Sequence, residues 1–234
     1  MRAPRLLVVA WLLLAGCAGG TDRRPVVFAA SSLRTVMDEL APEARISYGA
    51  SNELALQISE GAPADVFCSA EPGEVEHLRA RHLAGRTVEL ARDRLAGLVG
   101  QGVRAPRTLA GLAAPGVRLV VAAKGVPLGD YTRRVLAALS LIRALRNVVS
   151  EENDARSVVV KVSLGEADAG IVYATDVPSG ARVIEIPPHA QPDILYVCTS
   201  VATPARRALA ARLLDELSSA RARRALVEAG FLPP

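Results

Sequence analysis

The stretch Val26-Val27-Phe28-Ala29-Ala30-Ser31-Ser32-Leu33 joins a short apolar run of strand type to two hydroxyl residues. Apolar side chains then recur with the spacing of an amphipathic helix, at Leu33, Val36, Met37, Leu40 and Ala41. The stretch therefore predicts a buried strand that delivers two serines to the N-terminus of a helix. The first turn of a helix carries unpaired N–H groups and the positive end of the helix dipole, so it suits an anion. Serine is also a preferred N-cap residue, and for a single serine capping is the more common role.

The strand-then-helix unit recurs along the chain. We expect further strands at 45–48, 64–69, 117–123, 169–173 and 194–199, and helices at 53–59, 74–83, 131–147, after residue 155 and between 203 and 230. Such alternation is typical of parallel sheets with right-handed crossovers, which bind ligands beyond the carboxyl ends of their strands. A Gly-containing apolar run at 91–102 separates two series of units.

Two series of units, with a late strand and terminal helices left over, predict two lobes joined by a crossed connection. The expected fold class is α/β, each lobe being a mainly parallel sheet flanked by helices, with a ligand cleft between the lobes. Lobe 1 is expected at 25–97 and 197–234, and lobe 2 at 98–196.

The N-terminus indicates export. Two arginines precede the apolar run 6–14, which is too short to span a bilayer as a permanent helix. The following Leu14-Ala15-Gly16-Cys17 resembles the lipobox of bacterial lipoproteins, which implies a signal peptide at 1–16, acylation of Cys17 and a lipidated tether at 17–24. We expect a periplasmic or cell-surface protein that is anchored to a membrane at Cys17. The alternative is an ordinary secretory signal with an incidental cysteine.

The composition disfavours several other functions. Aromatic residues make up 3% of the chain and the net charge is +4 without a concentrated basic stripe, which argues against nucleic acid as a partner. His77 and His82 fall on different faces of one expected helix, so no metal site is expected. Cys68 and Cys198 lie in strand-like runs; an exported protein can oxidise such a pair, but we favour two unpaired small apolar side chains.

Several runs of the chain are similar to the periplasmic molybdate-binding proteins of bacterial ABC transporters, which have the type II periplasmic binding fold. The matching runs are 27–33, 54–58, 61–67, 126–131, 154–157 and 165–176, and the last of them, Gly-Glu-Ala-Asp-Ala-Gly-Ile-Val-Tyr-Ala-Thr-Asp, is the most specific. The resemblance covers nearly the whole mature chain. It implies a monomeric solute-binding protein that delivers molybdate or tungstate to a membrane permease with its ATPase.

The resemblance also implies a ligand site. In this family two serine hydroxyls, helix-end amides and one tyrosine hydroxyl hold the oxyanion, and these positions correspond to Ser32, Ser51, Leu128, Ala155 and Tyr173. Molybdate, tungstate and sulfate are dianions that only accept hydrogen bonds, so neutral donors suffice. No catalytic residue, cofactor or direct cation ligand is implied. A tyrosine at a strand end also has a simpler interpretation, in which it covers the core and its hydroxyl lies in water.

The chain departs from the family pattern near Ser51. Ala50 stands where a serine is usual, and Asn52-Glu53 replaces a small residue and a threonine. We expect Glu53 to face solvent in the first turn of a helix, where the dipole favours a carboxylate. Leu128 replaces a small residue and could narrow the cleft.

Three other functions stay open at the level of the sequence. The first is a binding protein for another oxyanion such as sulfate. The second is a secreted serine hydrolase that uses Ser51, although a nucleophile elbow requires Gly where Glu53 stands. The third is a lipoprotein with this fold that serves as a sensor or a structural element.

Overall fold

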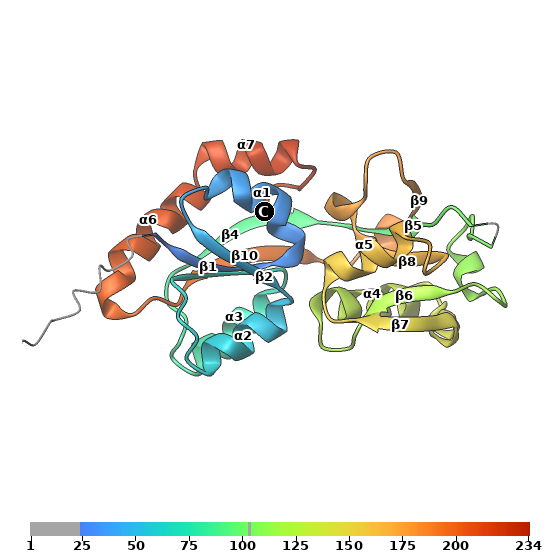
Figure 1. The fold of residues 1–234 in the computed structure, drawn as a ribbon, viewed down its shortest axis with the longest axis horizontal. Helices are drawn as coiled ribbons and strands as arrows, with labels where there is room; N and C mark the ends of the chain where they lie inside the picture. The colour runs from blue at the N-terminus through green and yellow to red at the C-terminus, as the bar shows by residue number, and fades with distance from the viewer. Residues whose placement is uncertain (1–23, 103) are drawn as a thin grey trace, which may run out of the picture.

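Two five-stranded sheets, one in each lobe, organise the protein (Figure 1). The computed structural model describes residues 24–102 and 104–234. The signal peptide and the lipidation site predicted at Cys17 therefore lie outside the described residues. Among the residues that are described, no helix has both the length and the apolar character needed to cross a bilayer.

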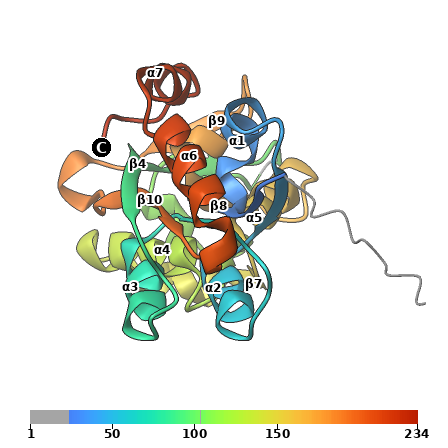
Figure 2. The ribbon, with the colours of Figure 1, turned by 90° about the vertical axis from the view of Figure 1, so that its left-hand side faces the viewer.

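Lobe 1 holds the first sheet, with strand order β2-β1-β3-β10-β4. Its strands are β1 (Val26–Ala30), β2 (Arg45–Gly49), β3 (Val66–Ser69), β4 (Thr87–Asp93) and β10 (Ile194–Ser200). Its helices are η1 (Ser31–Leu33), α1 (Arg34–Leu40), α2 (Ser51–Ser59), α3 (Pro72–Ala80), η6 (Pro204–Arg206), α6 (Arg207–Leu217) and α7 (Ala220–Glu228). Helices α1 and α7 lie on one side of the sheet, and α2 and α3 on the other (Figure 2).

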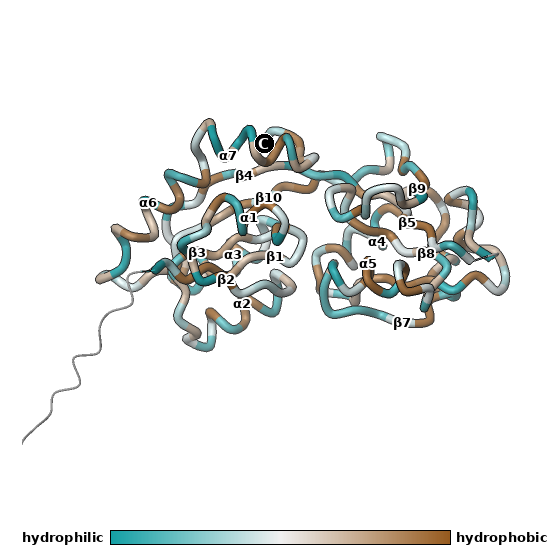
Figure 3. Tube along the Cα trace, turned by 45° about the horizontal axis from the view of Figure 1, so that its top comes forward, coloured by the Kyte–Doolittle hydropathy of each residue, from teal (hydrophilic) through white to brown (hydrophobic). Residues whose placement is uncertain are grey.

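Lobe 2 holds the second sheet, with strand order β7-β6-β8-β5-β9. Its strands are β5 (Leu95–Val99), β6 (Leu119–Ala122), β7 (Val148–Glu152), β8 (Ala169–Tyr173) and β9 (Arg182–Glu185). Its helices are η2 (Ala110–Ala113), α4 (Pro127–Ala138), η3 (Ile142–Asn147), α5 (Ala155–Ser163), η4 (Ala174–Asp176) and η5 (Pro188–Ala190). In both lobes the apolar segments run along the sheets, and the polar segments lie toward the outside (Figure 3).

The two-lobed α/β fold expected from the sequence is confirmed. In the first sheet only β10 runs against the other four strands, and in the second sheet only β5 does so. The sheets are therefore mixed, although most strands share one direction. The antiparallel strands are those that follow a passage of the chain from one lobe to the other.

Two passages of the chain connect the lobes. The first runs from β4 through Arg94 into β5, and the second runs through residues 186–193 into β10. The boundaries expected at 97/98 and 196/197 thus fall inside β5 and β10. The Gln191 side chain joins the two passages, because it accepts a hydrogen bond from the Leu95 N–H at 2.9 Å and donates one to the Leu95 carbonyl at 2.8 Å. These two connections are where the chain passes between the lobes, so a rotation of one lobe against the other would have its hinge there.

Some predicted elements have different bounds in the structure. The helix expected at 131–147 begins at Pro127 and ends at Ala138, because Ser140 adopts a left-handed backbone with φ 57° and the chain continues as η3. Glycine usually occupies that position, so a serine there is not recognised as the end of a helix. The run at 91–102 contains the end of β4 and all of β5, and β7 and β9 were not predicted. The helix after Ala155 is confirmed as α5.

Cys68 and Cys198 form a disulfide, so the prediction that they are unpaired is wrong. The two residues are direct partners on the neighbouring antiparallel strands β3 and β10, with their Cα atoms 4.0 Å apart. Local sequence patterns cannot pair these cysteines, because their register depends on the return of β10 to lobe 1 across a sequence separation of 130. The bond ties that returning strand to the centre of the first sheet.

We expect the Cys68→Ala/Cys198→Ala variant to unfold more easily than the oxidised protein. Closing a chain segment this long restricts the unfolded state, so the free energy of unfolding should fall by about 3–5 kcal/mol. Urea titration followed by far-UV circular dichroism measures the difference, and the wild-type protein in reductant serves as the control. Equal midpoints for the oxidised protein and the variant would contradict the prediction.

Candidate functional site

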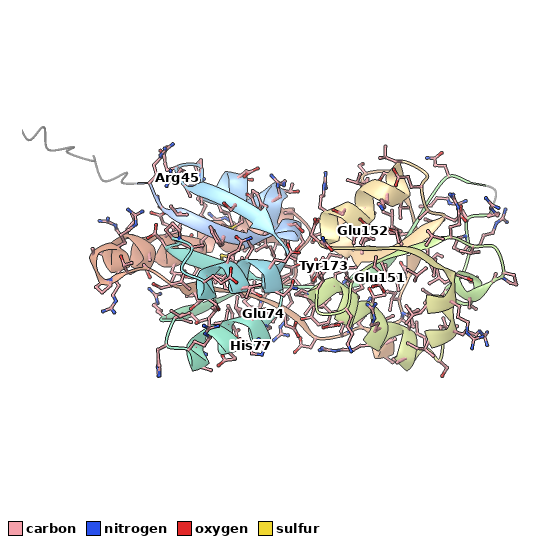
Figure 4. The ribbon with its side chains drawn as sticks, turned by 60° about the horizontal axis from the view of Figure 1, so that its bottom comes forward. Arg45, Glu74, His77, Glu151, Glu152 and Tyr173 are labelled. Carbon is pink, nitrogen blue, oxygen red and sulfur yellow. A yellow bond between two sulfur atoms is a disulfide. The ribbon has the colours of Figure 1, made fainter. Side chains whose placement is uncertain are left out.

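A buried cavity lies between the lobes, and all five residues that the sequence analysis selected line it. Its wall comes from β1, η1, β2, α2 and the residue after β3 in lobe 1, and from β8, α4 and α5 in lobe 2. The complete lining is Ala30, Ser31, Ser32, Gly49, Ala50, Ser51, Ala70, Val126, Pro127, Leu128, Ala155 and Tyr173. Tyr173 is seen at the junction of the lobes in Figure 4. The structure thus brings together Ser32, Ser51, Leu128, Ala155 and Tyr173, which are spread over most of the chain.

The two serines of lobe 1 lie at helix starts that follow parallel strands. Ser32 is in η1, directly after β1, and Ser51 is the first residue of α2. Their exposed fractions are 4% and 1%. The capping role considered for Ser31 and Ser32 is wrong, because Ala30 is the N-cap residue of η1 and no side chain caps this helix. The hydroxyl groups of Ser31 and Ser32 therefore do not cap η1.

Lobe 2 contributes the first turns of α4 and α5. Pro127 occupies the first position of α4, where its missing N–H costs nothing, and the N–H of the next residue, Leu128, has no partner within the helix. Ala155 is the first residue of α5, and Asp154 caps that helix by accepting a hydrogen bond from the Ser157 N–H at 3.0 Å. Both amides are therefore available as donors at the positive end of a helix.

Gly129 fixes how closely α4 approaches the sheet of lobe 2. A Cβ atom at this position would lie 2.0 Å from the carbonyl oxygen of Ala123 and 2.5 Å from that of Ala122. Only glycine permits this close approach of the helix to the end of β6. The position of the Leu128 amide therefore depends on the absence of a side chain at the next residue.

Tyr173 ends β8 and its hydroxyl is buried. The residue is 1% exposed, and among the described residues its hydroxyl has no hydrogen-bond partner. The alternative in which this hydroxyl lies in water is therefore wrong. Burial raises the pKa of Tyr173 well above its usual range, so the group stays protonated and can donate.

The cavity is neutral. None of its lining residues carries a charged side chain, and Glu53 is exposed in the first turn of α2, as expected. Ala50 and Leu128 both line the cavity, so the departures from the family pattern bear directly on its size and donors. The centre of a water-sized sphere can move through only about 10 Å³ of it, about the space that one water molecule requires. A larger ligand requires the lobes to separate or the Leu128 side chain to turn.

Two tyrosines behind the lining were missed by the sequence analysis. The Tyr196 and Ser32 hydroxyl oxygens are 2.9 Å apart, and the Tyr196 ring packs against Tyr173 and Phe231 with centroid distances of 5.8 and 5.4 Å. The Tyr131 hydroxyl donates to the Ala70 carbonyl at 3.3 Å. The chain has only four tyrosines, and three of them gather here. The small number of tyrosines was the one feature of the sequence that could have pointed to Tyr131 and Tyr196.

Comparison with known proteins agrees with this architecture. Residues 25–232 match the family described as bacterial extracellular solute-binding protein. The chain belongs to this family. The molybdate-binding protein ModA of Mycobacterium tuberculosis is 32% identical to this solute-binding protein over 233 aligned residues, which cover 93% of the chain and 88% of the relative. ModA of Haemophilus influenzae is 27% identical, with 94% and 95% covered.

A solved structure shares the fold. The periplasmic molybdate-binding protein of Azotobacter vinelandii superposes on this solute-binding protein with a TM-score of 0.79 at 23% sequence identity. The superposition covers 90% of this chain and 100% of the other. The two-lobed arrangement is therefore the common architecture of both proteins.

Two contacts hold the lobes of this solute-binding protein together beside the cavity. The Tyr131 hydroxyl of α4 reaches the Ala70 carbonyl at the end of β3, and Arg134 of α4 lies 3.5 Å from the Glu71 carboxylate. Helix α5 also packs against η1 across the cleft. The lobes are therefore in contact around the site.

Two buried carboxyl groups lie near the hinge. Asp93 ends β4 and accepts hydrogen bonds from the Thr175 hydroxyl at 2.7 Å and the Arg94 N–H at 2.6 Å. Burial raises the pKa of Asp93 to about 6. Burial, and after it the charge of Asp93, raises the pKa of Asp176 to about 7. One oxygen of Asp176 has no partner among the described residues. Ionisation of both carboxyl groups near neutral pH therefore destabilises the folded protein.

The raised pKa values predict that stability falls as pH rises through about 6 and 7. An unfolded aspartate titrates at its ordinary value of 3.8, so between that value and the folded pKa the folded state binds more protons than the unfolded state. The contribution of these groups to the free energy of unfolding is complete below the unfolded pKa and is lost as pH rises through the folded pKa.

We therefore expect Asp176→Asn to reduce the loss of stability between pH 5 and pH 8 and to raise the melting temperature at about pH 8. Thermal unfolding at a series of pH values measures both effects. Asp215→Asn changes an exposed carboxylate of α6 and serves as the matched control, with the wild-type slope expected. A slope unchanged in Asp176→Asn would show that this carboxyl group does not titrate with folding.

Proposed function

We propose that this protein is the extracytoplasmic solute-binding component of an ABC importer and that it captures molybdate, or the similar tungstate ion. The observation that carries the proposal is a buried cavity lined by neutral hydrogen-bond donors from both lobes, with no charged side chain. The relatives that are named molybdate-binding proteins, matched over most of their length, support the same ligand. Ser32, Ser51 and Tyr173 would donate through their hydroxyls, and Leu128 and Ala155 through their amides.

The donor set suits a dianion that has lost all its protons. Each oxygen of such an ion can only accept hydrogen bonds, and every proposed contact can donate one. About seven charge-assisted bonds at roughly 1.5 kcal/mol each would supply about 10 kcal/mol, equivalent to a Kd on the order of tens of nanomolar before the cost of closure. Hydrogen phosphate retains a proton that requires an acceptor, and no carboxylate lines the cavity. Neutral donors therefore favour molybdate over phosphate.

Capture would proceed by closure of the lobes about the hinge. With the lobes apart, the donors of each lobe are accessible, and an oxyanion can bind to one set of helix starts. Rotation about the connections at Arg94 and residues 186–193 then brings the second set to the ion. The closed form would dock on the permease, whose ATPase drives import.

The site supports binding rather than hydrolysis. The Ser51 hydroxyl oxygen accepts a hydrogen bond from the Ala70 N–H at 3.1 Å, and no histidine lines the cavity to remove its proton. A general base within hydrogen-bond reach is what activates a serine nucleophile. Among the described residues no group of three potential metal ligands is present either. We therefore propose a monomeric binding protein that has no catalytic activity and no cofactor.

Molybdate and tungstate should raise the melting temperature of the purified protein at micromolar concentration, because a ligand that binds only the folded state stabilises it. Calorimetric titration then gives the affinity. Ser32→Ala and Tyr173→Phe should each weaken molybdate binding by about 1–3 kcal/mol, because each removes one charge-assisted hydrogen bond.

The control for the serine variant is Ser218→Ala, which removes a hydroxyl bonded to the Leu214 carbonyl in α6, far from the cavity. It should bind molybdate as the wild type does. Sulfate, phosphate and chromate are tested in parallel. A shift with sulfate and none with molybdate at millimolar concentration would overturn the proposed ligand.

The proposed lipid anchor is tested in the producing cell. Because acylation requires the Cys17 thiol, Cys17→Ser should move the protein from the membrane fraction to the soluble extract of an exporting bacterium. Metabolic labelling with a palmitate analogue should mark the wild-type protein and not the variant. Cys68→Ala/Cys198→Ala, which retains Cys17, serves as the labelled control. Equal fractionation and labelling of wild type and Cys17→Ser would contradict acylation at this residue.

A further inference from the structure

Each serine of the site is in contact with a second polar group. The Ser32 hydroxyl oxygen lies 2.9 Å from the Tyr196 hydroxyl oxygen, and the Ser51 hydroxyl oxygen accepts a hydrogen bond from the Ala70 N–H at 3.1 Å. An amide N–H can only donate, so the hydrogen of Ser51 is left for another acceptor. Ser51 must therefore present its hydrogen to the cavity.

The direction of the Ser32–Tyr196 bond follows from burial. Tyr196 is 0% exposed, and Ser32 is the one hydrogen-bond partner of its hydroxyl in the part of the chain that the structure describes. If Ser32 donated to Tyr196, the tyrosine hydrogen would be buried without an acceptor, which is unfavourable. Burial also raises the pKa of Tyr196 well above its usual range, so the phenol keeps that hydrogen. The tyrosine is therefore the donor and Ser32 is the acceptor.

Tyr196 is held in place for this role. It comes from β10, the strand that returns from lobe 2, and its ring contacts Phe231 edge-on at 89° and Tyr173 at 58°. The disulfide joins the same strand to β3 two residues further on, at Cys198. These contacts keep the buried phenol beside Ser32 and away from solvent.

We propose that Tyr196 is a positioning residue that determines specificity, because it donates to Ser32 and so obliges this serine to donate into the cavity. The inference rests on the proposed function and deepens it. A serine alone could turn its lone pair toward the O–H of a protonated oxyanion, and would then accept phosphate. When Tyr196 donates to Ser32, the serine hydroxyl keeps one lone pair and its own hydrogen, which needs an acceptor. A facing oxygen without a hydrogen supplies that acceptor, whereas a serine that turned its remaining lone pair to a protonated oxygen would leave its own hydrogen buried without a partner. The protein thereby determines which partner donates each hydrogen bond, and not only how many bonds form.

The test is a double-mutant cycle with Tyr196→Phe and Ser32→Ala, with molybdate and inorganic phosphate as the probes. Tyr196→Phe keeps the ring contacts and removes only the hydroxyl. It should weaken molybdate binding about tenfold and leave phosphate binding unchanged or stronger, so that the ratio of the two affinities falls. In the Ser32→Ala background, the same change should alter molybdate affinity by less than about twofold. Tyr48→Phe, which removes a hydroxyl bonded to Asp38, is the matched control and should bind both ions as the wild type does.

The outcomes separate this inference from the proposed function. A wild-type protein that binds no molybdate would overturn the proposed function itself. A wild type that binds molybdate, together with a Tyr196→Phe effect that is equal for both ions or persists in the Ser32→Ala background, would overturn the positioning role alone. A neutron structure of the wild-type protein with molybdate is the second measurement. It should show the phenolic deuterium pointing at Ser32, and a serine deuterium pointing at Tyr196 would refute the proposal.

Discussion

The site depends on one constraint, which is that every polar group facing the cavity must donate. The helices supply most of the donors directly, because the first N–H groups of a helix have no partner within it. The first turns of η1, α2, α4 and α5 meet at the cavity, so amide donors from both lobes converge without any cation. A hydroxyl group can either donate or accept a hydrogen bond, so each serine needs a second group that determines which of the two it does toward the cavity. Ala70 provides it for Ser51, and Tyr196 provides it for Ser32.

The topology explains why so many helix starts meet. In each sheet the helix start follows the carboxyl end of a strand, as Ser32 follows β1 and Ala155 follows β7. Because most strands in a sheet share one direction, all these ends lie at one edge, and the two edges face each other across the cleft. The antiparallel strands β5 and β10 are the exceptions. Each follows a connection between the lobes and carries the chain from that connection into its sheet, which lets the two edges face each other. The same two passages of the chain between the lobes therefore form the connections about which the lobes would rotate and bring the two halves of the site face to face.

Sequence patterns predicted the parts of the site that are local. A strand that ends in a hydroxyl residue before an amphipathic helix identifies Ser32 and Ser51 within a few residues, and family motifs added Leu128, Ala155 and Tyr173. What could not be predicted depends on contacts between distant segments. Tyr196 meets Ser32 across 164 positions, and the disulfide needs the register of β10 on β3. The end of α4 at Ser140 escaped for a local reason, since a left-handed serine gives no signal of the kind that glycine does.

Closure and binding are coupled through the same donors. The Tyr173 hydroxyl is buried between the lobes with no acceptor from the described residues, and a buried donor without a partner costs roughly 1–3 kcal/mol. The first amides of α4 and α5 add to this cost when closure removes them from water. An ion that only accepts hydrogen bonds offsets several of these penalties at once, whereas a cation or a protonated group would add to them. On the proposed function, the closed arrangement would gain stability from a ligand that only accepts hydrogen bonds, because such a ligand would satisfy donors contributed by both lobes.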